Sequence, residues 1–156
     1  MAIVQTAGTE IIRSIMYDNL DNSPTGELVL GAQHHIYTIL SIIVYCHTAS
    51  STVSENRWTA TITGFSGRGC ATASEMTVFK TPILVAGQTY VWNDKFSFNG
   101  FEPLQSSLSG EYNTVAEQTA VAAQAHASAQ QYFTMVGGGS TAKADIFCTF
   151  IDQNNA

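Results

Sequence analysis

Apolar and polar residues alternate along most of this chain, and the longest such stretch is residues 34–48, HHIYTILSIIVYCHT. Side chains of a strand point alternately to opposite faces, and here both sets are largely apolar. The first set is Ile36, Leu40, Ile42 and Val44, and the second is Tyr37, Ile39, Ile43 and Tyr45. The pattern predicts a strand that is covered on both faces or runs through the centre of a sheet, and we interpret it as the central strand of a sandwich. Its apolar run is too short for a membrane helix.

Other stretches with alternating or β-branched residues predict further strands, separated by turn-forming residues such as those in 18–26 and 64–69. The expected strands are 3–17, 27–31, 57–65, 72–82, 88–98, 132–136 and 142–152. The last two, joined by the glycines of 137–140, are expected to form a closing hairpin. Seven to nine short strands in 156 residues predict an all-β fold, a single antiparallel, jelly-roll-like β-sandwich domain over residues 1–156.

Residues 99–131 differ from the rest and are interpreted as an insertion in the sandwich. The part at 113–131 is rich in Ala and Gln, and Thr114 with Glu117 has the spacing of a helix capping box. A helix would form a stripe of small residues, whereas strict alternation over 123–130 suits a strand, so both alternatives stay open. The stripe and its neighbour are our candidate contact residues for self-association or lattice binding: Val115, Ala116, Ala120, Ala123 and Ala127.

Charge is scarce, since only 12% of residues are charged, and the net charge is −6. The six Lys and Arg residues are scattered, which argues against nucleic-acid binding. A surface of neutral polar residues suits contacts with other proteins, because little charge must be desolvated. Residues 1–10 show no secretory signal, and three widely spaced cysteines predict buried free thiols made in a reducing compartment.

The residues that usually carry chemistry are not grouped in this sequence. His34 and His35 are adjacent and point to opposite faces of a strand, so they do not suit one metal ion. The stretch GFSGRG at 64–69 is one residue short of a nucleophile elbow. We therefore expect no enzyme activity, no catalytic residues, no metal site and no cofactor.

Four stretches occur in an order that resembles the small β-sandwich virion proteins of tailed bacteriophages, which include head decoration (cement) proteins and tail or fibre accessory proteins. They are ILSIIVYCHTASS, WTATITGF, TVFKTPILVAGQTYVW and FTMVGGGSTAKADIFCTFID. The resemblance covers about two thirds of the chain and implies a virion location after synthesis in the host cytoplasm. It also implies contacts with the major capsid protein or other virion proteins, commonly as a homotrimer, and no catalytic residues.

The expected function is therefore that of a non-enzymatic virion structural protein, a capsid decoration protein that stabilises the particle, with no nucleic-acid or membrane partner. Residues 1–10 are expected to form a second contact arm. One alternative is a tail-fibre, neck or other appendage component. Another is a carbohydrate-binding module that would use Tyr90, Trp92 or Trp58 on an exposed face.

Overall fold

The computed structural model describes residues 10–65, 72–103 and 125–154, and these residues form eleven strands and one 3-10 turn, Val53–Glu55. The strands are β1 (Glu10–Leu20), β2 (Gly26–Leu30), β3 (His35–Thr48), β4 (Trp58–Phe65), β5 (Ala73–Lys80), β6 (Gln88–Trp92), β7 (Phe96–Asn99), β8 (Phe101–Pro103), β9 (Ala125–Gln130), β10 (Tyr132–Gly137) and β11 (Lys143–Asn154). The described part of the chain has no helix long and apolar enough to cross a membrane.

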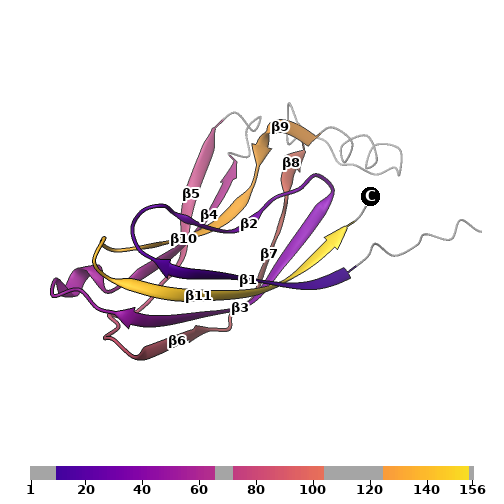
Figure 1. Cartoon of the computed structure of the whole chain (residues 1–156). Coiled ribbons are helices and arrows are strands. Elements are labelled where there is room, and N and C mark those ends of the chain that lie inside the picture. The colour runs from indigo at the N-terminus through magenta and orange to yellow at the C-terminus, as the bar shows by residue number, and fades with distance from the viewer. Residues whose placement is uncertain (1–9, 66–71, 104–124, 155–156) are drawn as a thin grey trace, which may run out of the picture.

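Two antiparallel sheets pack face to face, which confirms the predicted β-sandwich (Figure 1). The first sheet has the order β1-β11-β3-β6, and β7 also pairs with β3. The second sheet has the order β2-β10-β4-β5, and β8 pairs with β9 in a two-stranded ribbon. The core between the sheets contains side chains from both, and Trp58, Phe133 and Ile42 are fully buried there. The Trp58 indole Nε1 donates a hydrogen bond to the Leu20 carbonyl at 3.1 Å.

Strand β3 is central, as predicted, but it is covered on one face only. The register with β11 shifts between Ile39 and Ser41, so Leu40 is an extra residue in β3. Such a bulge exchanges the two faces of a strand. As a result Tyr37 and Ile39 point into the core before the bulge, and even-numbered residues such as Ile42 do so after it. Two apolar sets thus share one face. Of the two alternatives, the structure shows the second, a strand that runs through the centre of a sheet between β11 and β6.

The predicted closing hairpin is wrong, because its two strands lie in different sheets. Strand β10 pairs with β2 and β4, whereas β11 pairs with β1 and β3. The glycine-rich connection crosses between the sheets, where the Gly137 and Gly138 amides donate to the carbonyls of Asp21 and Arg57, both at 2.8 Å. A Cβ on Gly138 would lie 2.9 Å from the Glu55 carbonyl oxygen, so this close crossing requires glycine.

The segment 99–131 is partly described. Ala125–Gln130 is strand β9, so the strand alternative holds there, and Ala127 lies on that strand. The ribbon joins the sandwich where the Gln131 amide donates to the Gly100 carbonyl, 2.8 Å away, and the Gly31 amide donates to the Gln131 carbonyl, 2.9 Å away. Residues 1–9 of the expected arm lie outside the described residues. The other four candidate contact residues also lie outside them: Val115, Ala116, Ala120 and Ala123.

Candidate functional site

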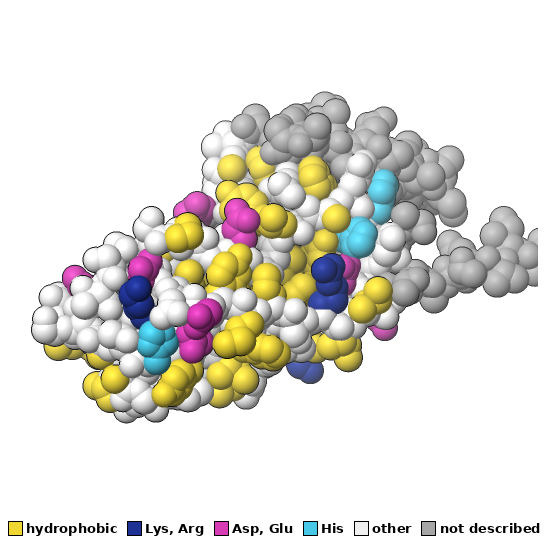
Figure 2. All heavy atoms as spheres, in the orientation of Figure 1, with side chains coloured by type: hydrophobic (Ala, Val, Ile, Leu, Met, Phe, Trp, Pro, Cys, Tyr) yellow, Lys and Arg dark blue, Asp and Glu magenta, His cyan; other side chains and the backbone are white. Residues whose placement is uncertain are grey.

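A row of four large apolar side chains lies on the outer face of the first sheet. Met16 of β1 pairs with Phe147 of β11, Phe147 pairs with Ile43 of β3, and Ile43 pairs with Val91 of β6. Their exposed fractions are 60%, 40%, 36% and 49%, respectively. We call these four residues the outer row. Figure 2 shows hydrophobic side chains gathered over this sheet, and contiguous exposed apolar surface of this kind marks interaction sites.

Polar residues border the outer row on both sides. Ser14, Thr149 and Ser41 form the next row of outward positions, and the first two hydroxyls are 3.4 Å apart. On the other side Asp145 accepts a hydrogen bond from the Asn19 amide at 3.0 Å. Among the residues paired across these strands, the outward positions next to the outer row carry one formal charge, the Asp145 carboxylate, which already has a partner, and Asp18, two residues after Met16 in β1, is a further exposed acid. Little charge would be desolvated when this face is covered.

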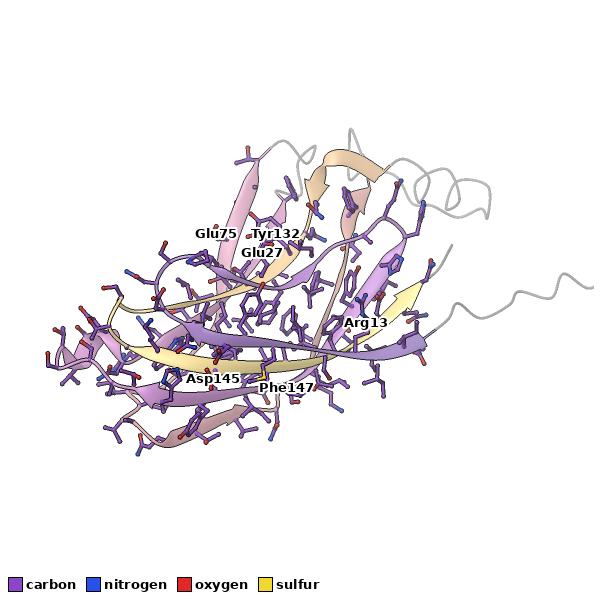
Figure 3. The ribbon with its side chains drawn as sticks, in the orientation of Figure 1. Arg13, Glu27, Glu75, Tyr132, Asp145 and Phe147 are labelled. Atoms are coloured by element: carbon purple, nitrogen blue, oxygen red, sulfur yellow. The ribbon has the colours of Figure 1, made fainter. Side chains whose placement is uncertain are left out.

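A groove of about 370 Å³ opens on one side of the sandwich, between the edge strands β1 and β2. Figure 3 labels Arg13 of β1 and Glu27 of β2, which both line it. Apolar side chains form much of the lining: Ile15, Leu28, Val29, Tyr37 and Phe150. We call this feature the β1/β2 groove. Its volume lies in the range of small-ligand pockets, roughly 300–1,000 Å³.

Polar contacts bound the β1/β2 groove at two places along β1. The Tyr17 hydroxyl donates to the Glu27 carbonyl at 2.8 Å and so joins β1 to β2. Farther along β1, the Arg13 guanidinium donates to Asp152 at 2.9 Å, and the His35 ring Nδ1 donates to the other oxygen of that carboxylate at 2.6 Å. The apolar lining of the β1/β2 groove is therefore flanked by two polar features. One is the Tyr17 hydrogen bond that joins β1 to β2, and the other is the cluster of Arg13, His35 and Asp152.

Asp152 is the buried acid of that cluster, with 6% of its surface exposed. Burial alone would raise the pKa of Asp152, but the hydrogen bonds from His35 and Arg13 outweigh it, so the pKa lies below its ordinary value. The carboxylate therefore stays ionised and neutralises Arg13. The Arg13 side chain also lies over the Phe150 ring, 5.9 Å from its centroid.

The opposite side of the sandwich is closed by aromatic side chains. Phe79 of β5 stacks on Trp92 of β6 with ring centroids 5.0 Å apart, which joins the two sheets. Phe96 packs edge-on against both Trp92 and Phe133, at 5.9 Å and 5.2 Å. Trp58 and Trp92 are buried, with 0% and 8% exposure, so neither ring is available to stack on a sugar. The sugar-binding alternative therefore loses two of its three rings, and the third, Tyr90, is half-buried against Phe79.

Cys46 and Cys148 are buried free thiols, as predicted, and Cys70 lies outside the described residues. Burial raises the pKa of Cys148 to about 12 and raises the pKa of Cys46 as well. Both thiols stay protonated at neutral pH, so neither is a ready nucleophile or metal ligand. Within the described ranges, no three His, Cys, Asp or Glu side chains are grouped so that they could hold a metal ion.

No family model matches this chain, and no curated protein matches it. Solved structures do resemble it. A Bacillus endospore appendage protein, from a family of disulfide-linked pili, is 13% identical with a TM-score of 0.43, over 99% of this chain and 96% of that one. A protein of infectious bursal disease virus, Gx strain, is 9% identical with a TM-score of 0.41, over 96% of this chain and 33% of that one.

A third structure contains the CBM22-1 and GH10 modules of Clostridium thermocellum xylanase 10B. It is 9% identical with a TM-score of 0.40, over 93% of this chain and 24% of that one. This chain thus spans about a quarter of the xylanase chain and about a third of the viral chain. At such low identities and TM-scores these likenesses support no inference about function.

Proposed function

We propose that this chain is a non-enzymatic structural protein of a virus particle, a capsid decoration protein that stabilises the particle by contacts with neighbouring subunits. The observation that carries the proposal is the outer row, Met16, Phe147, Ile43 and Val91, which is exposed in the isolated chain. The order of sequence stretches that resembles small virion proteins supports the same role. In this proposal, catalysis is not part of the function.

The outer row suits a protein partner for a physical reason. Burying exposed apolar area is favourable by roughly 25 cal/mol per Å². The adjacent Ser14, Thr149 and Ser41 are neutral, so they can exchange water for partner hydrogen bonds without the cost of desolvating a charge. We assign the outer row to the contact with the capsid protein.

We further propose that the protein acts as a homotrimer, which is common among the virion proteins it resembles. The residues predicted for self-association remain those of the inserted segment: Val115, Ala116, Ala120, Ala123 and Ala127. Deletion of 113–131 is expected to leave a folded sandwich that no longer forms trimers or binds particles. A deletion variant that decorates particles at wild-type occupancy would contradict this assignment.

Localisation on particles tests the proposed function. Antibodies against the purified chain are applied, with gold labels, to phage particles released by the host that carries this gene. We expect label on the heads. Label on tails, necks or fibres would replace the decoration role with that of an appendage component, and particles without any label would contradict a virion role altogether.

A further inference from the structure

We propose that the β1/β2 groove receives residues 1–9 of a second copy of this chain, which add as a strand beside β1. The proposal rests on the proposed function as an assembly subunit, and it names one contact between the copies. It uses a different surface from the outer row, which faces away from the core.

The first argument is the pair of free strand edges beside the groove. Within the described ranges, β1 pairs only with β11, and β2 pairs only with β10. A free edge presents backbone amides and carbonyls that an extended peptide can bind as an additional strand. Tyr17 already occupies the Glu27 carbonyl of β2, so β1 offers the longer free edge.

The second argument is the lining of the groove. Every second side chain of a strand added beside β1 would point between the sheets. There it would meet Ile15, Tyr37 and Phe150, and the nearby charge of Arg13 is neutralised by Asp152. The site therefore favours an extended segment with small or apolar, uncharged side chains.

Residues 1–9, MAIVQTAGT, have that chemistry. They include no charged side chain and no proline, so nothing in them opposes a strand in an apolar groove. Ile3 and Val4 are adjacent, so either phase of the added strand places one β-branched residue in the groove. The segment is directly connected to β1, and each copy thus carries both an arm and a groove.

The direction of β1 favours a second copy over the chain's own arm. Strand β1 runs from Glu10 to Leu20, and its groove-lining residues 13–17 follow the point where the arm joins. The arm would have to reverse direction within nine residues to enter its own groove. Insertion into the next copy needs no reversal, and such head-to-tail contacts close into a ring when the rotation allows it. A ring of three agrees with the proposed trimer.

A mixing experiment with two full-length variants tests the proposal. The arm variant carries Ile3→Asp and Val4→Asp, and the groove variant carries Ile15→Trp, which fills the β1/β2 groove. Ile12→Trp is the matched control, because Ile12 lies on the outer side of β1 and is 70% exposed. Masses are measured by light scattering, and circular dichroism checks folding.

We expect the wild type and Ile12→Trp to associate, and each test variant to be monomeric alone, because in this proposal the inserted segment holds two copies together only where an arm also joins them. The mixture should form one-to-one dimers, since one variant keeps an intact groove and the other an intact arm. A mixture that stays monomeric, an arm variant that associates like the wild type, or a wild type that is monomeric would overturn the proposal. The mixing experiment measures association between copies, whereas antibody labelling measures the location on particles. The groove proposal and the proposed function can therefore fail independently of each other.

If the Ile15→Trp variant does not fold, binding of a peptide with the sequence of residues 1–9 tests the same proposal. A fluorescent peptide of residues 1–9 is titrated into the folded arm variant, and its anisotropy is followed. We expect binding at least tenfold tighter than that of the same peptide with Asp in place of Ile3 and Val4. Equal binding of the two peptides, or no binding of either, would overturn the proposal.

Discussion

The two open sides of the sandwich are built differently. On the side of β5 and β6, Phe79 and Trp92 stack at 5.0 Å and close the space between the sheets with the chain's own aromatic rings. On the side of β1 and β2, a groove of about 370 Å³ remains, and one tyrosine hydroxyl bridges the two edges. The difference indicates that one side serves stability, while the other is free to serve contact with a partner.

Removal of an aromatic ring on the closed side, between β5 and β6, is expected to have the largest effect on the free energy of unfolding. Trp92→Ala should lower the free energy of unfolding by about 3–5 kcal/mol, since it deletes a buried aromatic side chain and leaves a cavity. Ile15→Ala on the open side should cost about 1 kcal/mol, because Ile15 is only partly buried. Urea denaturation measures both, and equal losses would remove the distinction between the sides.

A smaller effect is expected from the ion-paired cluster at the open side. The folded pKa of Asp152 lies below its unfolded value, which is about 3.9 for a free Asp. The unfolded chain therefore binds more protons as the pH falls. This stabilisation is complete above the unfolded pKa and is lost as the pH falls through the folded pKa.

Asp152→Asn should consequently cost about 1.5–3 kcal/mol of unfolding free energy at pH 7, the usual value for hydrogen bonds to a charged group. The difference from the wild type should shrink as the pH is lowered below the unfolded pKa. Asp94→Asn is the control, since its side chain is exposed in the connection between β6 and β7. A difference that stays constant over the pH range would contradict the role of the carboxylate charge.

The smallest effect is expected from the bridge across the open side. Tyr17→Phe removes the hydrogen bond to the Glu27 carbonyl and should cost about 0.5–1.5 kcal/mol. Tyr45→Phe, on the outer face of β3, is the control and should change stability little. Hydrogen exchange of the β1 amides should also become faster in Tyr17→Phe, and unchanged exchange would show that the bridge does not hold the two edges together.

Much of the fold follows from alternation and turn residues, because one-sided burial imposes a period of two on each strand. The errors arise where tertiary contacts decide. Leu40 gives no local sign of the bulge that exchanges the faces of β3. The alternation therefore predicts Ile39 and Ile43 on one face, whereas Ile39 is buried and Ile43 is 36% exposed. The glycines at 137–139 suit a hairpin as well as a crossing between sheets, and only the pairing of β10 and β11 with different partners distinguishes the two.

The candidate surfaces were less accessible to sequence analysis. The outer row joins residues from four strands, so no local pattern places Met16 beside Phe147 or Val91 beside Ile43. The sequence of β1 does carry a signal for a contact surface. Ile11 and Ile12 are adjacent, so apolar residues occupy both faces of the strand, as expected of a strand that contacts the core on one face and a partner on the other. The β1/β2 groove depends on strand order, which alternation does not determine.

The central claim is that this molecule works through its outer row, and particle binding by one double variant tests it most directly. Ile43→Lys with Phe147→Lys places two charges in the outer row, whereas Val53→Lys places one at another exposed apolar position, 58% exposed. In co-sedimentation with particles from which the native protein has been removed, we expect at least a tenfold loss of binding for the double variant and wild-type binding for the control. Wild-type binding by a folded double variant would contradict the claim.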